Sequence, residues 1–259
     1  MDKPRVLLIK PHSPVTLNLI PLGLGYIAGE LENHGCHVRI IDMSAHYASI
    51  TINDVVEEIG SFSPHLIGFS IDITSVRSSH RLSEEISKLD TKAPLVCGGY
   101  YPTQFPRKVL DHHFDIAVRG EGEETICELV DLVMGKRDIK DISGITYKKD
   151  KEIFENPPRE PPEDLDKVPF PARHLFDENT YIRDVNERIN LGGLVSSRGC
   201  PYRCSYCCLY QMSGHVHRYR SAENIIREIR YMMDRYHINE FSFNDDIFTL
   251  NKERVKVLC

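Results

Sequence analysis

Apolar and polar positions in the first 135 residues follow two alternating patterns. Short, continuous apolar runs, typical of buried strands, are separated by stretches whose apolar residues recur at helical spacing. We interpret these runs as strands: Val6–Ile9, Val38–Ile41, Leu66–Ile71, Pro94–Gly99 and Asp115–Val118. The helical positions between and after them are Leu24, Ile27, Ala28 and Leu31; Ile52, Val55, Val56 and Ile59; Val76, Leu82, Ile86 and Leu89; and Ile126, Leu129, Val130 and Val133. Strands joined through helices predict a doubly wound, Rossmann-like α/β sheet, which binds ligands beyond the carboxyl ends of its strands.

The pattern changes after about residue 140. Gly144–Tyr147 and Glu152–Phe154 predict a small hairpin, and the prolines between Pro157 and Pro171 predict a semi-rigid linker, because each proline fixes φ and removes a backbone donor. Strand and helix signals then resume, in this order: strand Leu194–Ser197, a helix capped by Ser221, strand Glu240–Asn244 and a helix from Lys252. One face of the first of these helices carries Ile225, Ile226, Ile229, Met232, Met233 and Tyr236. We therefore divide the chain into residues 1–140, a hairpin and linker at 141–190, and a second domain at 191–259.

Composition narrows the class of protein. The chain has 259 residues, 41% hydrophobic and 27% charged, with a net charge of −6, which suits one large or two modest domains. No apolar run approaches the roughly 18 residues of a membrane span, and no secretory leader is apparent. A mildly acidic chain without long runs of like charge argues against binding to nucleic acid. We expect a cytoplasmic protein whose eight cysteines are ligands, nucleophiles or core residues instead of disulfides.

Three cysteines carry the strongest chemical signal. Cys200, Cys204 and Cys207 form a C-x3-C-x2-C pattern in a loop directly after a strand. Three thiolates at this spacing can hold three irons of a cubane cluster and leave the fourth iron open for chemistry. Structural zinc would need a fourth donor, which here would be Cys208, His215 or His217. The pattern favours the cluster, whereas Cys36, Cys97 and Cys127 lie in apolar contexts and are predicted to be packing residues.

The cysteine loop resembles that of the radical S-adenosylmethionine enzymes, whose C-x3-C-x-aromatic-C pattern is matched with Tyr206 as the aromatic residue. Four further segments are similar to the subfamily with an N-terminal cobalamin-binding domain: Pro21–Tyr26, Val118–Glu123, Pro169–Arg173 and Phe243–Phe248. The resemblance covers practically the whole chain. It implies that residues 191–259 begin a partial (β/α) barrel.

The resemblance also implies a function. Cofactors would be a [4Fe-4S] cluster on the three cysteines, S-adenosylmethionine and cobalamin. An external one-electron donor of flavodoxin or ferredoxin type would reduce the cluster, and cleavage of S-adenosylmethionine would give a 5′-deoxyadenosyl radical. That radical would serve methyl transfer to, or rearrangement of, an unactivated carbon of a small-molecule substrate. The cofactors carry the difficult step, so no side chain is assigned as catalytic.

The family pattern assigns contacts to S-adenosylmethionine near the cluster loop and at the end of the second barrel strand. They are Tyr206, Asn244, Asp245 and Asp246. Carboxylate and amide oxygens suit the methionine ammonium group, although a helix cap and a solvated acidic pair would use the same residues. Arg198 and Arg220 could meet a carboxylate or be surface charges.

Candidate cobalamin contacts follow the third, fourth and fifth strands. They are Ser70, Thr74, Gly98, Gly99, Gly120, Glu121 and Gly122. Glycine permits close approach of a ligand, but a turn that needs positive φ selects it too. The D-x-H-x-x-G motif that supplies a histidine to cobalt is missing, since neither Lys10–Pro14 nor Asp111–Ile116 matches it. His12 is a weak candidate, and the axial ligand stays open.

Two other functions remain open. One is a non-catalytic cobalamin- or nucleotide-binding module, or half of a split enzyme that needs a partner chain to complete its barrel. The other is a zinc-stabilised interaction protein. Residues 191–259 supply two βα units, whereas the family's barrel takes about six of about thirty residues or more. We expect a truncated chain with apolar helix faces left uncovered.

Overall fold

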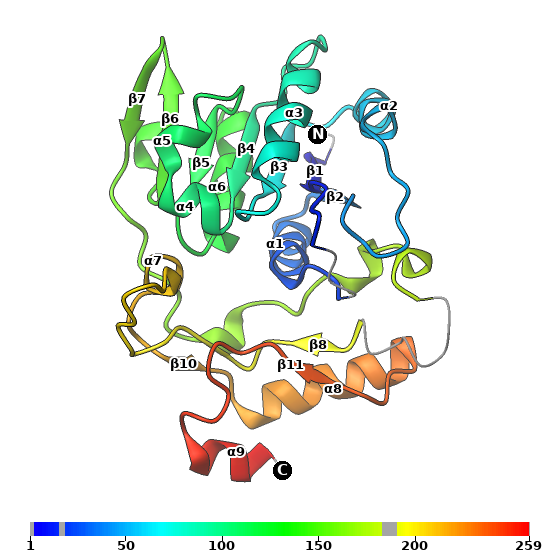
Figure 1. Cartoon of the computed structure of the whole chain (residues 1–259), viewed down its shortest axis with the longest axis vertical. Helices are drawn as coiled ribbons and strands as arrows, with labels where there is room; N and C mark the ends of the chain where they lie inside the picture. The colour runs from blue at the N-terminus through cyan, green and yellow to red at the C-terminus, as the bar shows by residue number, and fades with distance from the viewer. Residues whose placement is uncertain (1–2, 16–18, 183–190, 259) are drawn as a thin grey trace.

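The computed structural model describes residues 3–15, 19–182 and 191–258. Its largest element is a seven-stranded sheet in the order β2-β1-β3-β4-β5-β6-β7 (Figure 1). The strands are β1 (Arg5–Lys10), β2 (His37–Asp42), β3 (Leu66–Ser70), β4 (Leu95–Gly98), β5 (Ile116–Val118), β6 (Ile145–Lys149) and β7 (Glu152–Glu155). The first five are parallel, which confirms the doubly wound sheet. The expected hairpin, β6 and β7, pairs antiparallel to β5 and so extends this sheet, although we had grouped it with the linker.

Helices cover both faces of the sheet. They are α1 (Leu22–Asn33), α2 (Ile52–Phe62), α3 (Val76–Ser87), α4 (Tyr100–Gln104), α5 (Pro106–Val109) and α6 (Glu123–Val133). Because side chains alternate along a strand, Val6 and Leu8 of β1 join the core shared with α1 and α6, and Leu7 and Ile9 join the core shared with α2 and α3. The short helices α4 and α5 were not expected, since four or five residues are too few to show helical periodicity.

The proline-rich segment packs along α1. Ala172 donates its amide hydrogen to the carbonyl oxygen of Gly25 at 2.9 Å. A Cβ atom on Gly25 would lie 2.8 Å from the Cβ of Pro171, and one on Gly29 would lie 2.7 Å from the carbonyl oxygen of Phe170. Two of the family-like segments, Pro21–Tyr26 and Pro169–Arg173, therefore contact each other through glycine. The connecting segments also contain four short 3-10 helices: η1 (Ile139–Asp141) before β6, and η2 (Leu165–Lys167), η3 (Arg173–Leu175) and η4 (Glu178–Thr180) after β7.

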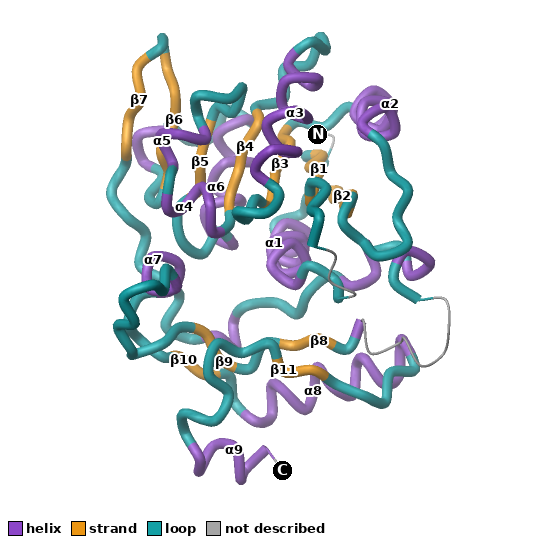
Figure 2. The backbone as a smooth tube through the Cα atoms, viewed as in Figure 1, coloured by secondary structure: helices purple, strands orange, loops and turns teal. Residues whose placement is uncertain are grey.

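The region after residue 191 consists of very short strands and two longer helices, and it lies below the large sheet in Figures 1 and 2. Its elements are β8 (Gly193–Leu194), β9 (Ser197–Arg198), α7 (Leu209–Ser213), β10 (Arg218–Tyr219), α8 (Ala222–Tyr236), β11 (Ser242–Phe243) and α9 (Lys252–Leu258). β8 pairs parallel with β11, and β9 pairs antiparallel with β10. The single strand expected at 194–197 is thus two strands with different partners.

Helix α8 begins as predicted, because the Ser221 hydroxyl accepts the Asn224 amide hydrogen at 3.1 Å. Only part of its apolar face is covered. Ile225 and Met232 are buried, whereas Ile226 is 38% and Met233 46% exposed. Within the described residues, no helix is long and apolar enough to cross a membrane.

A buried charge network ties α8 to the proline-rich segment. The Glu228 carboxylate lies 2.8 Å from Nη2 of Arg173 and 2.5 Å from Nη1 of Arg220. Arg173 also donates from Nε to the carbonyl oxygen of Leu191 at 3.1 Å and from Nη2 to that of Gly193 at 2.5 Å. The arginine of the Pro169–Arg173 segment therefore holds both the start of β8 and the middle of α8.

Candidate cofactor-binding cavity

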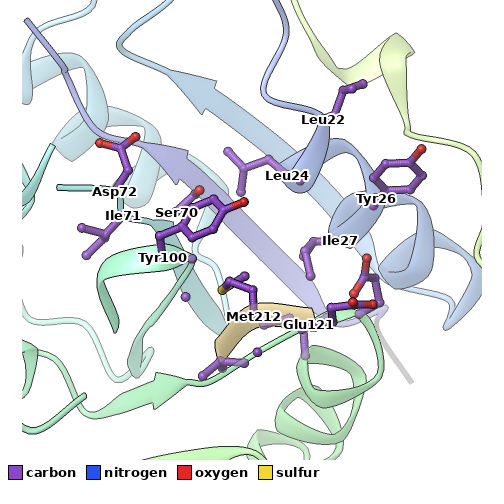
Figure 3. Close-up of a pocket in the computed structure, with 18 of the residues that line it drawn as sticks. Leu22, Leu24, Tyr26, Ile27, Ser70, Ile71, Asp72, Tyr100, Glu121 and Met212 are labelled. Carbon is purple, nitrogen blue, oxygen red and sulfur yellow. The ribbon is translucent and has the colours of Figure 1, made fainter. Parts of the chain in front are cut away.

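A cavity of about 420 Å³ lies between the carboxyl ends of β1, β3, β4 and β5 and the region after residue 191. Lys10 and Ser70 reach it from β1 and β3, which are neighbours in the sheet although β2 lies between them in the chain. Such a reversal of strand order opens a crevice where doubly wound sheets bind ligands. Met212 and Asp246 line it from the opposite side. Figure 3 shows Ser70, Tyr100 and Met212 arranged around this space.

The cavity collects most of the predicted contact residues. Those that line it are Ser70, Gly98, Gly99, Gly120, Glu121, Gly122, Asn244 and Asp246. Thr74 and Tyr206 are not among its lining residues. Thr74 is exposed, and its hydroxyl pairs with Asp72 and, at 2.7 Å, with Ser13. Tyr206 is 90% exposed on the cysteine loop.

The two glycines after β4 have different surroundings. Gly99 has φ +102°, and a Cβ atom there would lie 2.8 Å from the carbonyl oxygen of Ile71. The positive φ and the close backbone contact explain why residue 99 is glycine, without any need for a ligand. A Cβ on Gly98 would meet only Val118 atoms, no nearer than 3.7 Å, so its surroundings leave room at the cavity wall. Of the two, Gly98 is the position that a ligand could approach.

Lys10 and Asp72 form an ion pair at this edge of the sheet that we did not predict. Burial opposes ionisation of Asp72, but hydrogen bonds from Lys10 and Thr74 and the charge of Lys10 outweigh it and lower its pKa to about 2. Both residues line the cavity. Their positions could have predicted this role. Lys10 ends β1 and Asp72 follows β3, at the point where the strand order reverses.

Tyr100 is a further lining residue that the sequence pattern did not reveal. Burial raises the pKa of its phenol, and the charges of Asp246 and of the Cys207 and Cys208 thiols raise it further. The hydroxyl therefore stays protonated at neutral pH and can donate a hydrogen bond. Because Cys207 and Cys208 are close enough to affect its pKa, Tyr100 lies between the end of β4 and the cysteine loop.

The two aspartates after β11 are used differently. Asp245 is enclosed and accepts the Ser196 amide at 2.7 Å and the hydroxyls of Ser196 and Ser197 at 2.6 and 2.5 Å. Its oxygens are thus occupied by this chain, and it holds the entrance of the cysteine loop. Asp246 accepts the Gly199 amide hydrogen at 3.1 Å and lines the cavity. Burial is the main cause that raises the pKa of its carboxyl, and the nearby charge of Asp245 raises it further.

The cysteine loop folds back on itself. Gly199 has φ +87°, and a Cβ atom there would lie 2.2 Å from the carbonyl oxygen of Val216. Cys200 and Cys207 are half-buried free thiols and Cys204 is an exposed one. Within residues 3–15, 19–182 and 191–258, no three His, Cys, Asp or Glu side chains are grouped closely enough to hold a single metal ion. A four-iron cubane differs in taking each thiolate on a separate iron, and the three free thiols of this loop could serve three of its four irons.

The remaining candidate residues have partners within this chain. Arg198 pairs with Glu121 and Glu123, and Arg220 pairs with Glu228. Among the described residues, no histidine lines the cavity; the Nδ1 atom of exposed His12 lies 3.4 Å from the carbonyl oxygen of Met43. His215 stacks on Tyr210 and His217 packs edge-on against Tyr219.

Three other cysteines are buried packing residues, as predicted: Cys36, Cys97 and Cys127. Burial raises the pKa of the Cys36 thiol to about 11 and that of Cys127 to about 12, so both remain protonated.

Comparison with known proteins gives this cavity a context. Residues 13–130 match the family model described as the B12 binding domain. The chain is 31% identical to an uncharacterized methyltransferase, PH0819, of Pyrococcus horikoshii over 96% of this chain and 55% of that one. It is 27% identical to cytidylyl-2-hydroxyethylphosphonate methyltransferase of Streptomyces wedmorensis, over 98% of this chain and 57% of that one. Residues 13–130 thus match a B12-binding domain, and the chain is related to proteins named as methyltransferases.

Two solved structures have the same fold. The radical S-adenosylmethionine methyltransferase TsrM of Kitasatospora setae, with cobalamin and a [4Fe-4S] cluster bound, matches with a TM-score of 0.78 and 22% identity, over 99% of this chain and 50% of that one. The cobalamin-dependent S-adenosylmethionine radical enzyme OxsB, with aqua-cobalamin bound, matches with a TM-score of 0.82 and 19% identity, over 100% and 37%. The chain therefore spans about half or less of the length of these proteins.

Proposed function

We propose that the cavity binds cobalamin against the carboxyl ends of β1, β3, β4 and β5. On the side of the cavity opposite the sheet, Cys200, Cys204 and Cys207 would hold a [4Fe-4S] cluster that binds S-adenosylmethionine. The reaction would be methyl transfer to, or rearrangement of, an unactivated carbon of a small-molecule substrate. The observation that carries the proposal is that one cavity is lined by residues of both regions. The three cysteines do not line it, but Leu209 and Met212 of α7, in the same loop, do. A cofactor on the sheet and a cofactor on the cysteine loop would then face each other.

The residues of the chain suit these ligands. Around the sheet end, the Ser70 hydroxyl and the open surface at Gly98 can approach corrin amides. Asn244 and Asp246 offer amide and carboxylate oxygens to the methionine ammonium group. Asp245 was predicted to share this role, but in the proposal it positions the loop because its oxygens are already hydrogen-bonded. Thr74 and Tyr206 stay predictions.

Part of the cavity wall is apolar and would limit the water around the reacting groups. Its apolar lining includes Leu8, Leu22, Leu24, Ile27, Val96, Val118 and Met212. Bound together, the cluster and S-adenosylmethionine would supply the adenosyl radical and cobalamin the methyl group, whereas the chain would orient them and keep the site dry. We also propose a flavodoxin- or ferredoxin-type electron donor and a cytoplasmic location, since a reducing compartment keeps the loop thiols free for iron.

Two cysteines of the same loop offer a matched test. After anaerobic reconstitution with iron and sulfide, Cys204→Ala should lose the charge-transfer absorption of the cluster, and Cys208→Ala should keep it, because only Cys204 belongs to the C-x3-C-x2-C pattern. Iron and sulfide analysis provides the measurement. Equal iron content in wild type and in both variants would contradict the cluster assignment, and one zinc without iron in the wild type would favour a zinc protein.

The apolar side chains exposed on α8 favour a second candidate. Ile226 and Met233 would suit a covering partner chain, in which case this chain is a cobalamin-binding module or half of a split enzyme. The two candidates differ in one measurement. Release of 5′-deoxyadenosine by the reconstituted protein alone under strong reductant supports the enzyme, and its absence from a sample that holds both cofactors supports the module.

A further inference from the structure

The base of the cysteine loop contains an electrostatic conflict. β9 and β10 form an antiparallel ladder of two residue pairs, and in one of them Arg198 lies directly opposite Arg218. The loop between the strands, residues 199–217, carries all three cysteines of the predicted cluster. Like charges directly opposite each other destabilise a strand pair, and a ladder this short has few hydrogen bonds to offset the repulsion. The loop therefore needs a counter-charge at its base.

That counter-charge comes from the other domain. The carboxylate of Glu121, which follows β5, accepts Nη1 of Arg198 at 2.9 Å and also pairs with Nη2 of Arg218. All three side chains are shielded, with exposed fractions of 7% for Glu121, 13% for Arg198 and 7% for Arg218. Burial alone would raise the pKa of Glu121, but the two arginines outweigh it and lower that pKa. Glu121 therefore stays ionised between them.

Neighbouring contacts fix the direction from which Glu121 approaches. Gly120 has φ +77°, and a Cβ atom there would lie 3.3 Å from the carbonyl oxygen of Met212 in α7. The turn after β5 thus lies close against the helix inside the cysteine loop. Arg198 is further held by Glu123 at 2.7 Å and lies 4.9 Å from the ring centroid of Tyr26. Each of these contacts joins the loop base to the first domain.

We infer that Glu121 is a positioning residue that closes the cysteine loop by bridging Arg198 and Arg218, so that the loop forms only when it is docked on the first domain. What the loop then holds rests on the proposed function. Its closure, however, is a property of the chain alone. The same carboxylate borders the cavity, so loop closure and the assembly of the wall opposite the sheet occur together.

Trypsin can report on loop closure without any cofactor. Arg203 is exposed on the loop, and cleavage after it requires the backbone around it to open locally. In the cofactor-free chain, Glu121→Gln should raise the rate of cleavage after Arg203 by about tenfold or more, because it leaves two shielded arginines facing each other. Glu123→Gln is the matched control. It removes a carboxylate that pairs with Arg198 alone, so it should raise the rate less.

A second substitution separates the bridge from a general loss of packing. If repulsion opens the loop, adding Arg218→Gln to Glu121→Gln should slow cleavage relative to Glu121→Gln alone. Circular dichroism would confirm that the sheet remains folded in every variant. The inference would be overturned if Glu121→Gln were cleaved at the wild-type rate. It would also be overturned if the double variant were cleaved faster than both Glu121→Gln and Arg218→Gln. Failure of the wild type to take up iron would refute the cluster but leave this result standing.

Discussion

The two regions of the chain differ in the interactions that stabilise them. In the first, strands of three to six residues carry side chains such as Leu7 and Ile9 that are wholly buried between two layers of helices. In the second, each strand has two residues. Apolar side chains such as Ile225 and Met232 join the core shared with α1 and α6, and a buried ion pair between Arg173 and Glu228 adds to them. Hydrophobic burial is non-directional, whereas ion pairs and their hydrogen bonds fix orientation. The ion pairs thus fix how the second region is oriented on the apolar core that it shares with the first.

The largest effect should come from removing the charge at the centre of the α8 network. Glu228→Gln leaves the guanidinium groups of Arg173 and Arg220 buried without a counter-charge, which costs about 3–5 kcal/mol when a buried ion pair is broken. Chemical denaturation would measure the loss. Glu223→Gln, an exposed change on the same helix, is the control and should change the free energy of unfolding by less than about 0.5 kcal/mol. Equal losses in both variants would contradict a charge-held second region.

An intermediate effect should distinguish the two glycines in the first region. Gly99→Ala forces a side chain into positive φ and against the carbonyl oxygen of Ile71, so we expect a loss of about 1–3 kcal/mol of stability without any cofactor. Gly98→Ala has space and should lose less stability but bind cobalamin more weakly. Thermal unfolding and a cobalamin titration of both variants provide the test. A larger loss of stability at Gly98 than at Gly99 would reverse the roles that we assign.

The smallest effect should be a pH dependence at the sheet edge. The pKa of Asp72 is lowered to about 2, below the 3.8 of an unpaired aspartate, so its pairing stabilises the fold above about pH 4. That contribution disappears as the pH falls from about 4 to about 2. Lys10→Met should raise the pKa of Asp72 and flatten the stability profile within this window. Side-chain NMR titration would measure the change, and an unaltered pKa would show that Lys10 is not its cause.

Regular packing made the first region predictable from the sequence. Buried parallel strands read as continuous apolar runs, and helices such as α1, α3 and α6 show a full periodic face. The short α4 and α5 have no such period. The cysteine loop could also be predicted, because the spacing of its three cysteines is a local sequence pattern.

The partners of individual polar residues could not be predicted in the same way. Asp245 was expected to touch a cofactor, but Ser196 and Ser197 occupy its oxygens from 49 and 48 residues away. The role of Glu121 likewise depends on Arg198 and Arg218, which lie 77 and 97 residues further along the chain. Such pairs depend on how two regions dock, and local composition carries no signal for that.

The most direct test of the central claim is whether cobalamin and the cluster share the cavity. Electron paramagnetic resonance of the reconstituted protein, with cobalt in its paramagnetic Co(II) state and the cluster reduced, would measure this. A cobalt centre in the cavity of about 420 Å³ and a cluster on the cysteine loop, whose helix α7 lines that cavity, should couple, so the cobalt signal should broaden or split. The same signal should be unperturbed in Cys204→Ala, which lacks the cluster. An unperturbed cobalt signal in wild-type protein that contains both cofactors would contradict a shared cavity.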